Sequence, residues 1–243
     1  MKAIILAAGK GTRLDGAAVK PKCLVEVGGS TLLNRQIETL RASGISDIVV
    51  VIGFGGDSIR EHCDNEVSIV ENVDFAQTSS LYSLWLAREH LSEGFVVLNS
   101  DVLFHPQMLS DLLQSKHPDA LLISDVEPNP LGDEEMKIKV QDEFVVDISK
   151  DMSPLDADGE NVGIVKFGPV GAKVLVQYMN DLIANGSKKD WAPRAFLEYA
   201  RAYPLHALST GGLPWIEIDF PEDYQRAVSE IFPQIESQLQ HFR

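Results

Sequence analysis

The sequence has few of the residues that mark disulfide-stabilised or zinc-dependent proteins. Its 243 residues include only two cysteines, Cys23 and Cys63, which lie far apart and outside any Cys-x-x-Cys pair. The six histidines are scattered, and no two of them have His-x-x-x-His spacing. This pattern argues against a disulfide scaffold or a zinc site and favours a reducing compartment.

Basic residues and long apolar runs are scarce as well. The 21 Lys and Arg residues face 36 Asp and Glu residues, which gives a formal net charge of −15. Such an acidic surplus disfavours binding to nucleic acid or to anionic membranes. The apolar stretch at residues 1–8 is interrupted by Gly9-Lys10-Gly11, and the strongest later run, residues 48–52, is far shorter than a membrane span. We therefore expect no leader and no membrane insertion, and we predict a cytoplasmic protein.

The remaining composition is that of an ordinary folded domain. Apolar residues make up 44% and charged residues 23% of the chain, which excludes a disordered protein. A chain of this length buries roughly 70–75% of its unfolded surface and needs no metal or disulfide in order to fold. Because repeats and low-complexity linkers are absent, we predict one domain over residues 1–243.

Hydrophobic periodicity predicts alternating strands and helices in the first half of the chain. Strands are expected at 2–7, 47–52, 67–71, 95–100 and 120–124, and helices at 30–43, 57–63, 80–91 and 106–114. This alternation predicts right-handed βαβ crossovers and a mostly parallel sheet. The second half is expected to hold a hairpin (136–141 and 144–150), a strand (161–167), helices (170–184 and 192–202), and a last strand (214–218) before a helix that begins near Pro221.

The loop after the first strand concentrates positive charge. The first 22 residues carry a local charge of +4: Lys2, Lys10, Arg13, Lys20 and Lys22 against Asp15. Glycines in this loop let backbone N–H groups approach an anion, and the cations can neutralise it. In an open α/β sheet such a loop lies at the carboxyl end of a strand, where ligands bind. The loop predicts phosphate binding; a flexible, solvated turn with incidental charge is the alternative.

The same stretch contains a long ordered motif. The run Leu6-Ala7-Ala8-Gly9-Lys10-Gly11-Thr12-Arg13-Leu14 is followed by Pro21-Lys22-Cys23-Leu24. It lacks the Gly-Lys-Ser/Thr of a Walker loop and the GxGxxG of a dinucleotide site. It resembles the signature of the nucleotidyltransferases that activate sugar phosphates and small phosphorylated alcohols. Further matches make the phosphocholine cytidylyltransferase branch the most similar: Asn72, residues 79–84, 99–101, 148–150, 159–163 and 215–219.

The resemblance implies a fold that agrees with the strand and helix pattern. It implies an α/β protein with a Rossmann-like α/β/α sandwich, a mostly parallel central sheet and a small inserted β-containing substrate lobe. Within the single domain, roughly residues 1–130 would form the nucleotide-binding half and roughly 131–213 the acceptor-side lobe. Residues 214–243 would supply a returning strand and the C-terminal helix.

The implied activity is a Mg²⁺-dependent transfer of CMP from CTP to a small phosphorylated alcohol or phosphonate, with release of pyrophosphate. A phosphate oxygen of the acceptor would attack the α-phosphorus. Because this nucleophile is already an anion, no Ser-His-Asp triad is required, and none is recognisable. Catalysis would depend on positioning and on charge neutralisation. The expected partners are CTP and the acceptor, and a homo-oligomer stays open.

The resemblance assigns catalytic roles to Lys22, Arg13 and Asp101. Lys22 is expected to contact the α-phosphate and the acceptor phosphate, and Arg13 the leaving pyrophosphate. Asp101 and Asp219 are assigned to the Mg²⁺ ion, which typically takes one or two carboxylates together with phosphate oxygens. Each aspartate has a structural alternative. Asp101 could begin a turn, and Asp219-Phe220-Pro221-Glu222 has the spacing of a helix capping box.

The resemblance also assigns two binding sets. The nucleotide set is Leu6, Ala7, Ala8, Gly9, Gly11, Thr12, Arg13, Lys22, Asn72, Ser79, Ser80 and Ser100. Ser79-Ser80 could equally be a plain helix N-cap. The acceptor set is Lys150, Glu160, Glu198 and Glu217, although Lys150 could be a solvated lysine at the end of the hairpin.

A quaternary ammonium acceptor would need aromatic faces near a carboxylate. The aromatic candidates are Tyr82, Trp85, Trp191, Phe196 and Trp215. Choline-specific relatives carry aromatic residues at two positions that are Met136 and Leu197 here, which weakens phosphocholine as the acceptor. Other phosphorylated alcohols, a small aminophosphonate and a sugar phosphate therefore stay open.

Two other functions remain alternatives. One is a sugar-1-phosphate nucleotidyltransferase that uses another nucleoside triphosphate, which nucleotide preference would distinguish. The other is a non-catalytic nucleotide-binding or regulatory domain. The joint presence of Arg13, Lys22, Asp101 and Asp219 argues against the second, because a silent relative could lose any of them.

Overall fold

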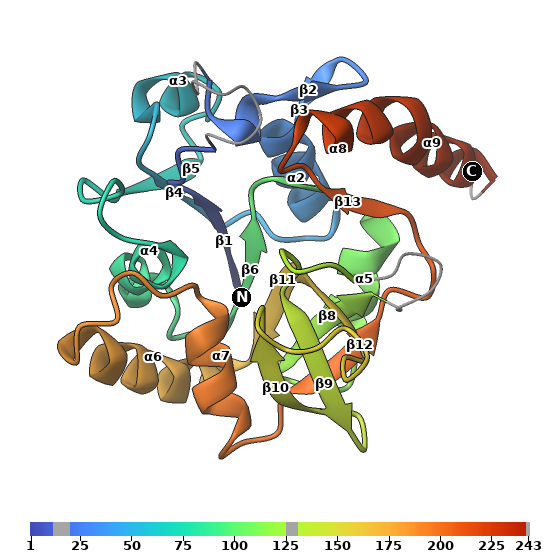
Figure 1. Ribbon diagram of the computed structural model, residues 1–243. Coiled ribbons are helices and arrows are strands. Elements are labelled where there is room, and N and C mark those ends of the chain that lie inside the picture. Colours follow the sequence, from blue (N-terminus) through green and yellow to red (C-terminus); the bar gives the residue numbers. More distant parts are fainter. Residues whose placement is uncertain (12–19, 125–130, 242–243) are drawn as a thin grey trace.

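The computed structural model describes residues 1–11, 20–124 and 131–241, and the account below refers to these. A nine-stranded mixed sheet runs through the molecule in the order β5-β4-β1-β6-β11-β8-β12-β10-β9 (Figure 1). Its strands are β1 (Lys2–Ala7), β4 (Ile48–Ile52), β5 (Val67–Glu71), β6 (Phe95–Asn99), β8 (Ala120–Ser124), β9 (Lys137–Gln141), β10 (Phe144–Ser149), β11 (Gly159–Phe167) and β12 (His206–Ser209).

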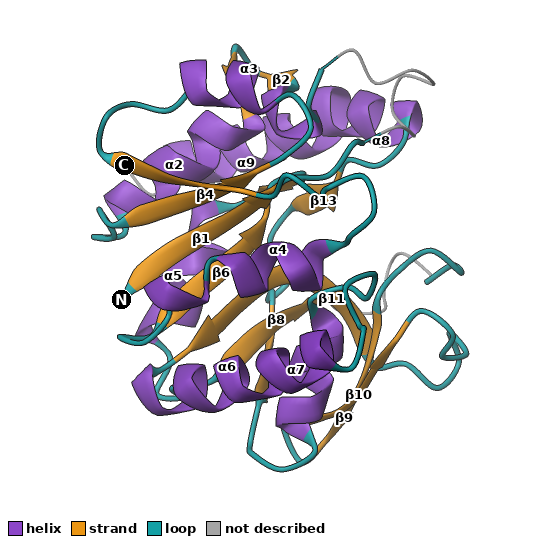
Figure 2. Ribbon diagram, turned by 90° about the vertical axis from the view of Figure 1, so that its left-hand side faces the viewer, coloured by secondary structure: helices purple, strands orange, loops and turns teal. Residues whose placement is uncertain are grey.

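Helices cover both faces of this sheet (Figure 2). The α-helices are α2 (Leu32–Ala42), α3 (Gly56–Glu61), α4 (Ser80–Leu86), α5 (Pro106–Gln114), α6 (Pro169–Ala184), α7 (Pro193–Ala200), α8 (Pro221–Arg226) and α9 (Phe232–His241). Shorter helical turns are η1 (Lys22–Leu24), η2 (Arg88–His90) and the π-helical η3 (Ala227–Ile231). None of the helices in the described part of the chain combines the length and hydrophobicity needed to cross a membrane.

Alternating residues of the central strands supply two separate cores. Ala3 and Ile5 of β1 pack on one face with residues of α2 and α5, including Leu33 and Leu109. Ile4 packs on the other face with residues of α4, α6 and α7. Successive side chains of a strand point to opposite faces, so a strand covered on both sides needs a continuous apolar run. This is why β4 consists entirely of buried Val and Ile residues.

The predicted mostly parallel sheet is correct for β5, β4, β1 and β6, which pair in parallel. The prediction of a mostly parallel sheet is corrected beyond β6, because β11 and β10 are antiparallel to the other seven strands of this sheet. Four of the eight neighbouring pairs in the sheet order are therefore antiparallel. The predicted lobe hairpin, β9 and β10, continues the central sheet at its edge through pairing with β11 and β12.

Two small sheets lie outside the large one. β13 (Trp215–Glu217) pairs antiparallel with β7 (Val102–Phe104), and β2 (Glu26–Val27) pairs with β3 (Ser30–Thr31). Ile216 and Ile218, at β13, pack with Ala227, Ile231 and Ile235 from the C-terminal helical region. This third core holds β13 beside the segment that follows β6, which brings two distant parts of the sequence together.

Candidate active site

A cavity of about 470 Å³ opens at the carboxyl ends of β1 and β6. These two strands are parallel neighbours, with Leu6 opposite Asn99, so the loops that leave them meet at one edge of the sheet. Many of the predicted site residues line this cavity: Leu6, Ala7, Ala8, Gly9, Gly11, Lys22, Asn72, Ser79, Ser80, Ser100, Asp101, Lys150, Glu217 and Asp219. Thr12 and Arg13, also predicted, lie outside the described residues.

Three carboxylates from two segments meet in the cavity. Glu217 ends β13 and lies opposite Val102 of β7, and the backbone N–H of Ile218 donates to the carbonyl oxygen of Asp101 at 3.0 Å. This pairing brings Asp101, Glu217 and Asp219 so close that one carboxylate oxygen of each lies within 4.8 Å of the others. Glu217 and Asp219 are two residues apart, the spacing that places side chains on one side of an extended chain.

Lys22 supplies a positive charge to this carboxylate cluster. Its Nζ donates a hydrogen bond to Oδ1 of Asp219 and lies 3.7 Å from Oδ2 of Asp101. Gly11 allows the lysine to pass close to the loop. Its φ is +58°, and a Cβ there would collide with the Lys22 side chain. The motif glycine and the motif lysine therefore fit together as one unit.

Burial dominates the electrostatics of the cluster. It raises the pKa of the Asp101 carboxyl, an effect that Lys22 opposes and Asp219 reinforces. Burial also raises the pKa of Glu217 well above its usual range, with Asp101 and Asp219 adding to the shift. Carboxylate oxygens crowded in this way are the ligands that a hard divalent cation such as Mg²⁺ takes. The three residues therefore fit a divalent-cation site.

The cluster bears on two expectations from the sequence. Glu217, expected to contact the acceptor, lines the cavity beside Asp101 and Asp219, so its contact with the acceptor stays a prediction. The alternative role of Asp219 as the cap of the last helix is contradicted, because the N-cap position is Phe220. The side chain that accepts hydrogen bonds from the backbone N–H groups of Asp219 and Phe220, at 3.0 and 2.8 Å, is Asp223. The capping arrangement is thus shifted by one residue, and Asp219 pairs with Lys22.

A second part of the cavity is polar but uncharged. The amide Nδ2 of Asn72 donates to the hydroxyl oxygens of Thr78 and Ser83, each at 3.0 Å, and all three residues line the cavity. Ser80, predicted to bind nucleotide, accepts a hydrogen bond from the backbone N–H of Ala192 at 2.8 Å and so ties α4 to the start of α7. Thr78 was not predicted as a site residue, although it directly precedes Ser79 and Ser80, which were.

The predicted acceptor residues separate in space. Lys150 lines the cavity, with its Nζ 3.6 Å from Oε2 of Glu134 and 5.0 Å from the centre of the Trp191 ring. Glu198 is outside the cavity lining, and its carboxylate pairs with Arg194 and Arg201 of its own helical region at 2.9 and 3.0 Å. The prediction for Glu198 is therefore corrected, because its helix turns this side chain toward basic neighbours.

Glu160 also stands apart from the cavity lining. It lies on β11 opposite Lys137 and Ser124. Burial, reinforced by the charge of Glu135, raises the pKa of the Glu160 carboxyl to about 7. Glu160 was expected to contact the acceptor, but the structure places it half-buried on β11, outside the described cavity lining.

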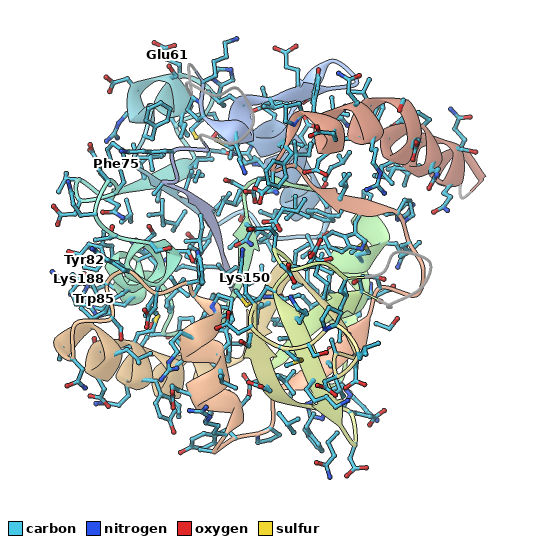
Figure 3. The ribbon with its side chains drawn as sticks, in the orientation of Figure 1. Glu61, Phe75, Tyr82, Trp85, Lys150 and Lys188 are labelled. Atoms are coloured by element: carbon cyan, nitrogen blue, oxygen red, sulfur yellow. The ribbon has the colours of Figure 1, made fainter. Side chains whose placement is uncertain are left out.

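Few aromatic faces are available for a cation. Of the five candidate aromatics, only Trp191 is among the described residues that line the cavity. Tyr82 and Trp85 stack on each other with Lys188 over the Tyr82 ring, and Figure 3 shows this group at one side of the molecule, away from Lys150. The described part of the cavity therefore has no aromatic cage.

The buried thiol of Cys23 also borders the cavity. Burial and the charge of Asp101 raise its pKa to about 12, so it stays protonated and unreactive at neutral pH. The raised pKa disfavours Cys23 as a nucleophile.

Comparisons with known proteins agree with this geometry. A family model described as the MobA-like NTP transferase domain matches residues 3–132. The chain is 30% identical over 230 residues to the bifunctional IPC transferase and DIPP synthase of Rubrobacter xylanophilus, covering 91% of this chain and 50% of that protein. It is 37% identical over 123 residues to the choline-phosphate cytidylyltransferase of Streptococcus pneumoniae, covering 48% and 52%. The chain thus spans about half the length of these curated relatives.

The fold is shared with a solved cytidylyltransferase. The structure of a CTP:phosphocholine cytidylyltransferase from Streptococcus pneumoniae superimposes with a TM-score of 0.76 and 26% sequence identity. The match covers 93% of this chain and 96% of that one. The Rossmann-like nucleotidyltransferase fold expected from the sequence is therefore confirmed.

Proposed function

The chain belongs to the family of MobA-like NTP transferase domains, and from this premise we propose that it transfers CMP from CTP to a small phosphorylated alcohol or phosphonate, releasing pyrophosphate. One observation carries the proposal: Lys22 lies among Asp101, Glu217 and Asp219 in a cavity beside the glycine loop. The lysine can neutralise phosphate charge directly, and the three carboxylates can hold the divalent cation that accompanies a triphosphate. The choline-phosphate cytidylyltransferase activity of Streptococcus pneumoniae, found among both the similar sequences and the similar structures, supports CTP as the donor.

The chain's own residues account for binding and orientation. Backbone N–H groups of the loop from Gly9 to Gly11 would hold the triphosphate, with Arg13 at the pyrophosphate end. Lys22 would neutralise charge on the α-phosphate and the acceptor phosphate as the new P–O bond forms and the bond to pyrophosphate breaks. Charge neutralisation of this kind works best in a partly buried site, where water screens it little.

Asp101 and Asp219, with Glu217 beside them, would hold a divalent cation, which we propose is Mg²⁺. When bound, the ion would offset the negative charge of the phosphates. Lys22 then has two sets of anionic partners, the carboxylates and the phosphates. Asp219 and Asp101 would orient the lysine before substrate arrives, since Nζ is hydrogen-bonded to Asp219 and lies 3.7 Å from Asp101.

Lys150 is the proposed ligand for the phosphate of the acceptor. Its ammonium group lies in the cavity between Glu134 and the Trp191 ring, beside Met136. With one aromatic ring and one cation in this region, the described pocket favours a small anionic acceptor over a bulky quaternary ammonium. A phosphorylated alcohol or an aminophosphonate has the required size and charge.

The test is pyrophosphate release measured with CTP, UTP, dTTP, GTP and ATP against phosphocholine, aminoethylphosphonate and glucose 1-phosphate. We expect turnover that depends on CTP and Mg²⁺ and is lost in Asp101→Ala. Turnover with UTP or dTTP and the sugar phosphate would instead establish a sugar-1-phosphate nucleotidyltransferase. Wild-type rates in Asp101→Ala would overturn the proposed metal site.

A further inference from the structure

One buried side chain of α2 is polar, although the other buried residues of this helix are apolar. The buried residues of α2 are Leu32, Leu33, Gln36, Ile37 and Leu40, which follow helical spacing. Gln36 is only 2% exposed. A buried amide costs stability unless hydrogen bonds replace the water that it loses. Packing alone therefore does not account for an amide at this position.

The amide of Gln36 joins the two ends of a turn. Its Nε2 group donates to the carbonyl oxygen of Asn99 and to that of Val102, each at 2.9 Å. Asn99 ends β6 and Val102 begins β7, and only Ser100 and Asp101 lie between them. Both partners are carbonyl oxygens, which accept and never donate, so the nitrogen of the amide must face the turn. The two hydrogens of this nitrogen are thus used on the two flanks of Asp101.

The other end of the amide gains nothing from its burial. Oε1 of Gln36 is buried and has no hydrogen-bond partner in the described part of the chain. A buried oxygen without a partner costs stability and offsets part of what the two Nε2 bonds contribute. An apolar side chain would avoid this cost. The placement of Gln36 therefore favours the geometry of the turn over the stability of the core.

The turn carries one of the three clustered carboxylates. Asp101 lies in it, and one of its carboxylate oxygens lies within 4.8 Å of an oxygen of Glu217 and of Asp219. The carbonyl oxygen of Asp101 also accepts the 3.0 Å hydrogen bond from the N–H of Ile218. Ligands of an ion must be held within about 0.5 Å of the geometry that binding requires. The bonds from Gln36 are placed to do this, because they fix the backbone on both sides of Asp101.

We propose that Gln36 is a positioning residue that holds Asp101 in place for the divalent cation. This inference rests on the proposed function, which supplies the cation. Gln36 lies outside the cavity lining and acts through the backbone of the turn. Without the amide, the carbonyl oxygens of Asn99 and Val102 lose their donor and the turn is free to shift. Asp101 then no longer meets Glu217 and Asp219 at one ion.

The experiment measures the binding of Mn²⁺ alone to the intact chain. Mn²⁺ takes the same oxygen ligands as Mg²⁺, and its free form is followed by electron paramagnetic resonance. The test variant is Gln36→Met, which removes the amide and keeps a side chain of similar length and helix propensity. Ile37→Val is the matched control, because it trims the buried part of the same helix and leaves the amide in place.

We expect Gln36→Met to weaken Mn²⁺ binding by about 10-fold or more, as is typical when a group that orients a metal ligand is removed. Ile37→Val should bind Mn²⁺ as the wild type does. Unchanged Mn²⁺ affinity in Gln36→Met, or an equal loss in both variants, would overturn the inference. Urea unfolding without metal confirms that each variant is folded.

A second readout separates positioning of the ion from damage to the nucleotide site. In the turnover assay, Gln36→Met should need about 10-fold more Mg²⁺ for half-maximal rate, with little change in the KM for CTP. A raised KM for CTP with an unchanged Mg²⁺ requirement would contradict the inference. If Gln36→Met does not fold, Gln36→Asn decides the matter, since it keeps an amide but withdraws it from the turn by one carbon atom. Wild-type Mn²⁺ affinity in Gln36→Asn would then overturn the inference.

The outcome is distinguishable from that of the proposed function. Weakened Mn²⁺ binding in Gln36→Met, with no pyrophosphate release by the wild type from any nucleotide tested, would support the inference and contradict the transferase. CTP-dependent turnover by the wild type, with unchanged Mn²⁺ affinity in Gln36→Met, would support the transferase and overturn the inference. A wild type that does not bind Mn²⁺ would overturn the cation site and the inference together.

Discussion

At the scale of single residues, Lys22 joins the two halves of the site. Its side chain passes against Gly11 of the glycine loop and ends among the carboxylates, at hydrogen-bond distance from Asp219. A flexible lysine tip anchored in this way is positioned before substrate binds. Its charge should therefore matter most as negative charge shifts during the reaction.

We predict that Lys22→Ala lowers kcat by about 10²–10³-fold and raises the KM for nucleotide far less. Steady-state kinetics with varied CTP gives both quantities. Lys20→Ala is the matched control, because Lys20 is exposed and lies outside the cavity lining. An effect of Lys22→Ala on KM alone would contradict a role in the transition state.

Glu160 should make stability depend on pH. Its pKa is about 7 in the folded protein because of burial and Glu135, against 4.5 for a free glutamate. Between these values the folded state binds more protons than the unfolded state, so the free energy of unfolding falls as pH rises and the loss is complete above pH 7.

The neutral variant Glu160→Gln should remove this part of the pH dependence. We predict that it matches the wild type near pH 4.5 and is more stable at pH 8, by on the order of 1 kcal/mol. Urea unfolding at both pH values measures the difference, with exposed Glu93→Gln as the control. The same difference between variant and wild type at both pH values would show that Glu160 does not titrate in this range.

At the scale of elements, the pairing of β13 with β7 creates the carboxylate cluster. Glu217 and Asp219 reach Asp101 because β13 returns to the segment after β6 and is held there by the core under η3 and α9. The following helix, α8, has its own cap in Asp223. We therefore infer that function and helix stability are divided between two aspartates four residues apart.

This division predicts opposite phenotypes for the two aspartates. Asp219→Asn should reduce kcat by about 100-fold or more and leave the melting temperature near that of the wild type. Asp223→Ala should retain most activity and lose about 1 kcal/mol of stability, as expected for a lost helix cap. Thermal unfolding and kinetics on both variants check this, and a destabilised Asp219→Asn with normal kcat would reverse the two roles.

The elements also show what the sequence can and cannot predict. Four elements were predicted with their observed bounds: residues 2–7, 67–71, 106–114 and 120–124. Their hydrophobic periodicity and their boundary residues are local features of the sequence. The short β12 was missed, since its half-exposed residues form no apolar run. The reversed directions of β10 and β11 depend on pairing between distant segments, which local patterns do not encode.

The same distinction applies to the site. The motif from Leu6 to Lys22 predicted a ligand-binding loop at the carboxyl end of the first strand, and Gly9, Gly11 and Lys22 line the cavity there, while phosphate binding stays a prediction. Glu198 was assigned to the site but lies outside the cavity lining, since its place depends on the direction in which the helix turns the side chain. The place of Glu217 in the carboxylate cluster was likewise not predicted, because it depends on the pairing of two distant segments. Asn72 was predicted to bind nucleotide, but its partners Thr78 and Ser83 become clear only in three dimensions.

At the scale of the whole molecule, the order of strands explains why the site forms where it does. β1 and β6 are central and parallel, so their following loops share one edge of the sheet, and β11 lies between β6 and the hairpin of β9 and β10 through its pairing with both β6 and β9. A protein with a net charge of −15 thus gathers Lys10, Lys22 and Lys150 in one cavity. Because the carboxylates of Asp101, Glu217 and Asp219 share this cavity, the lysines there suit a small phosphate ligand with a divalent cation better than they suit nucleic acid.

The most direct test of the central claim follows the phosphorus atoms of CTP. The chain is incubated with Mg²⁺, an acceptor that gives turnover, and CTP labelled with ³²P at either the α or the γ position. Cytidylyl transfer predicts that α-label appears in the acceptor product and γ-label in pyrophosphate. Transfer of γ-label to the acceptor, or release of α-label as free CMP, would contradict the account.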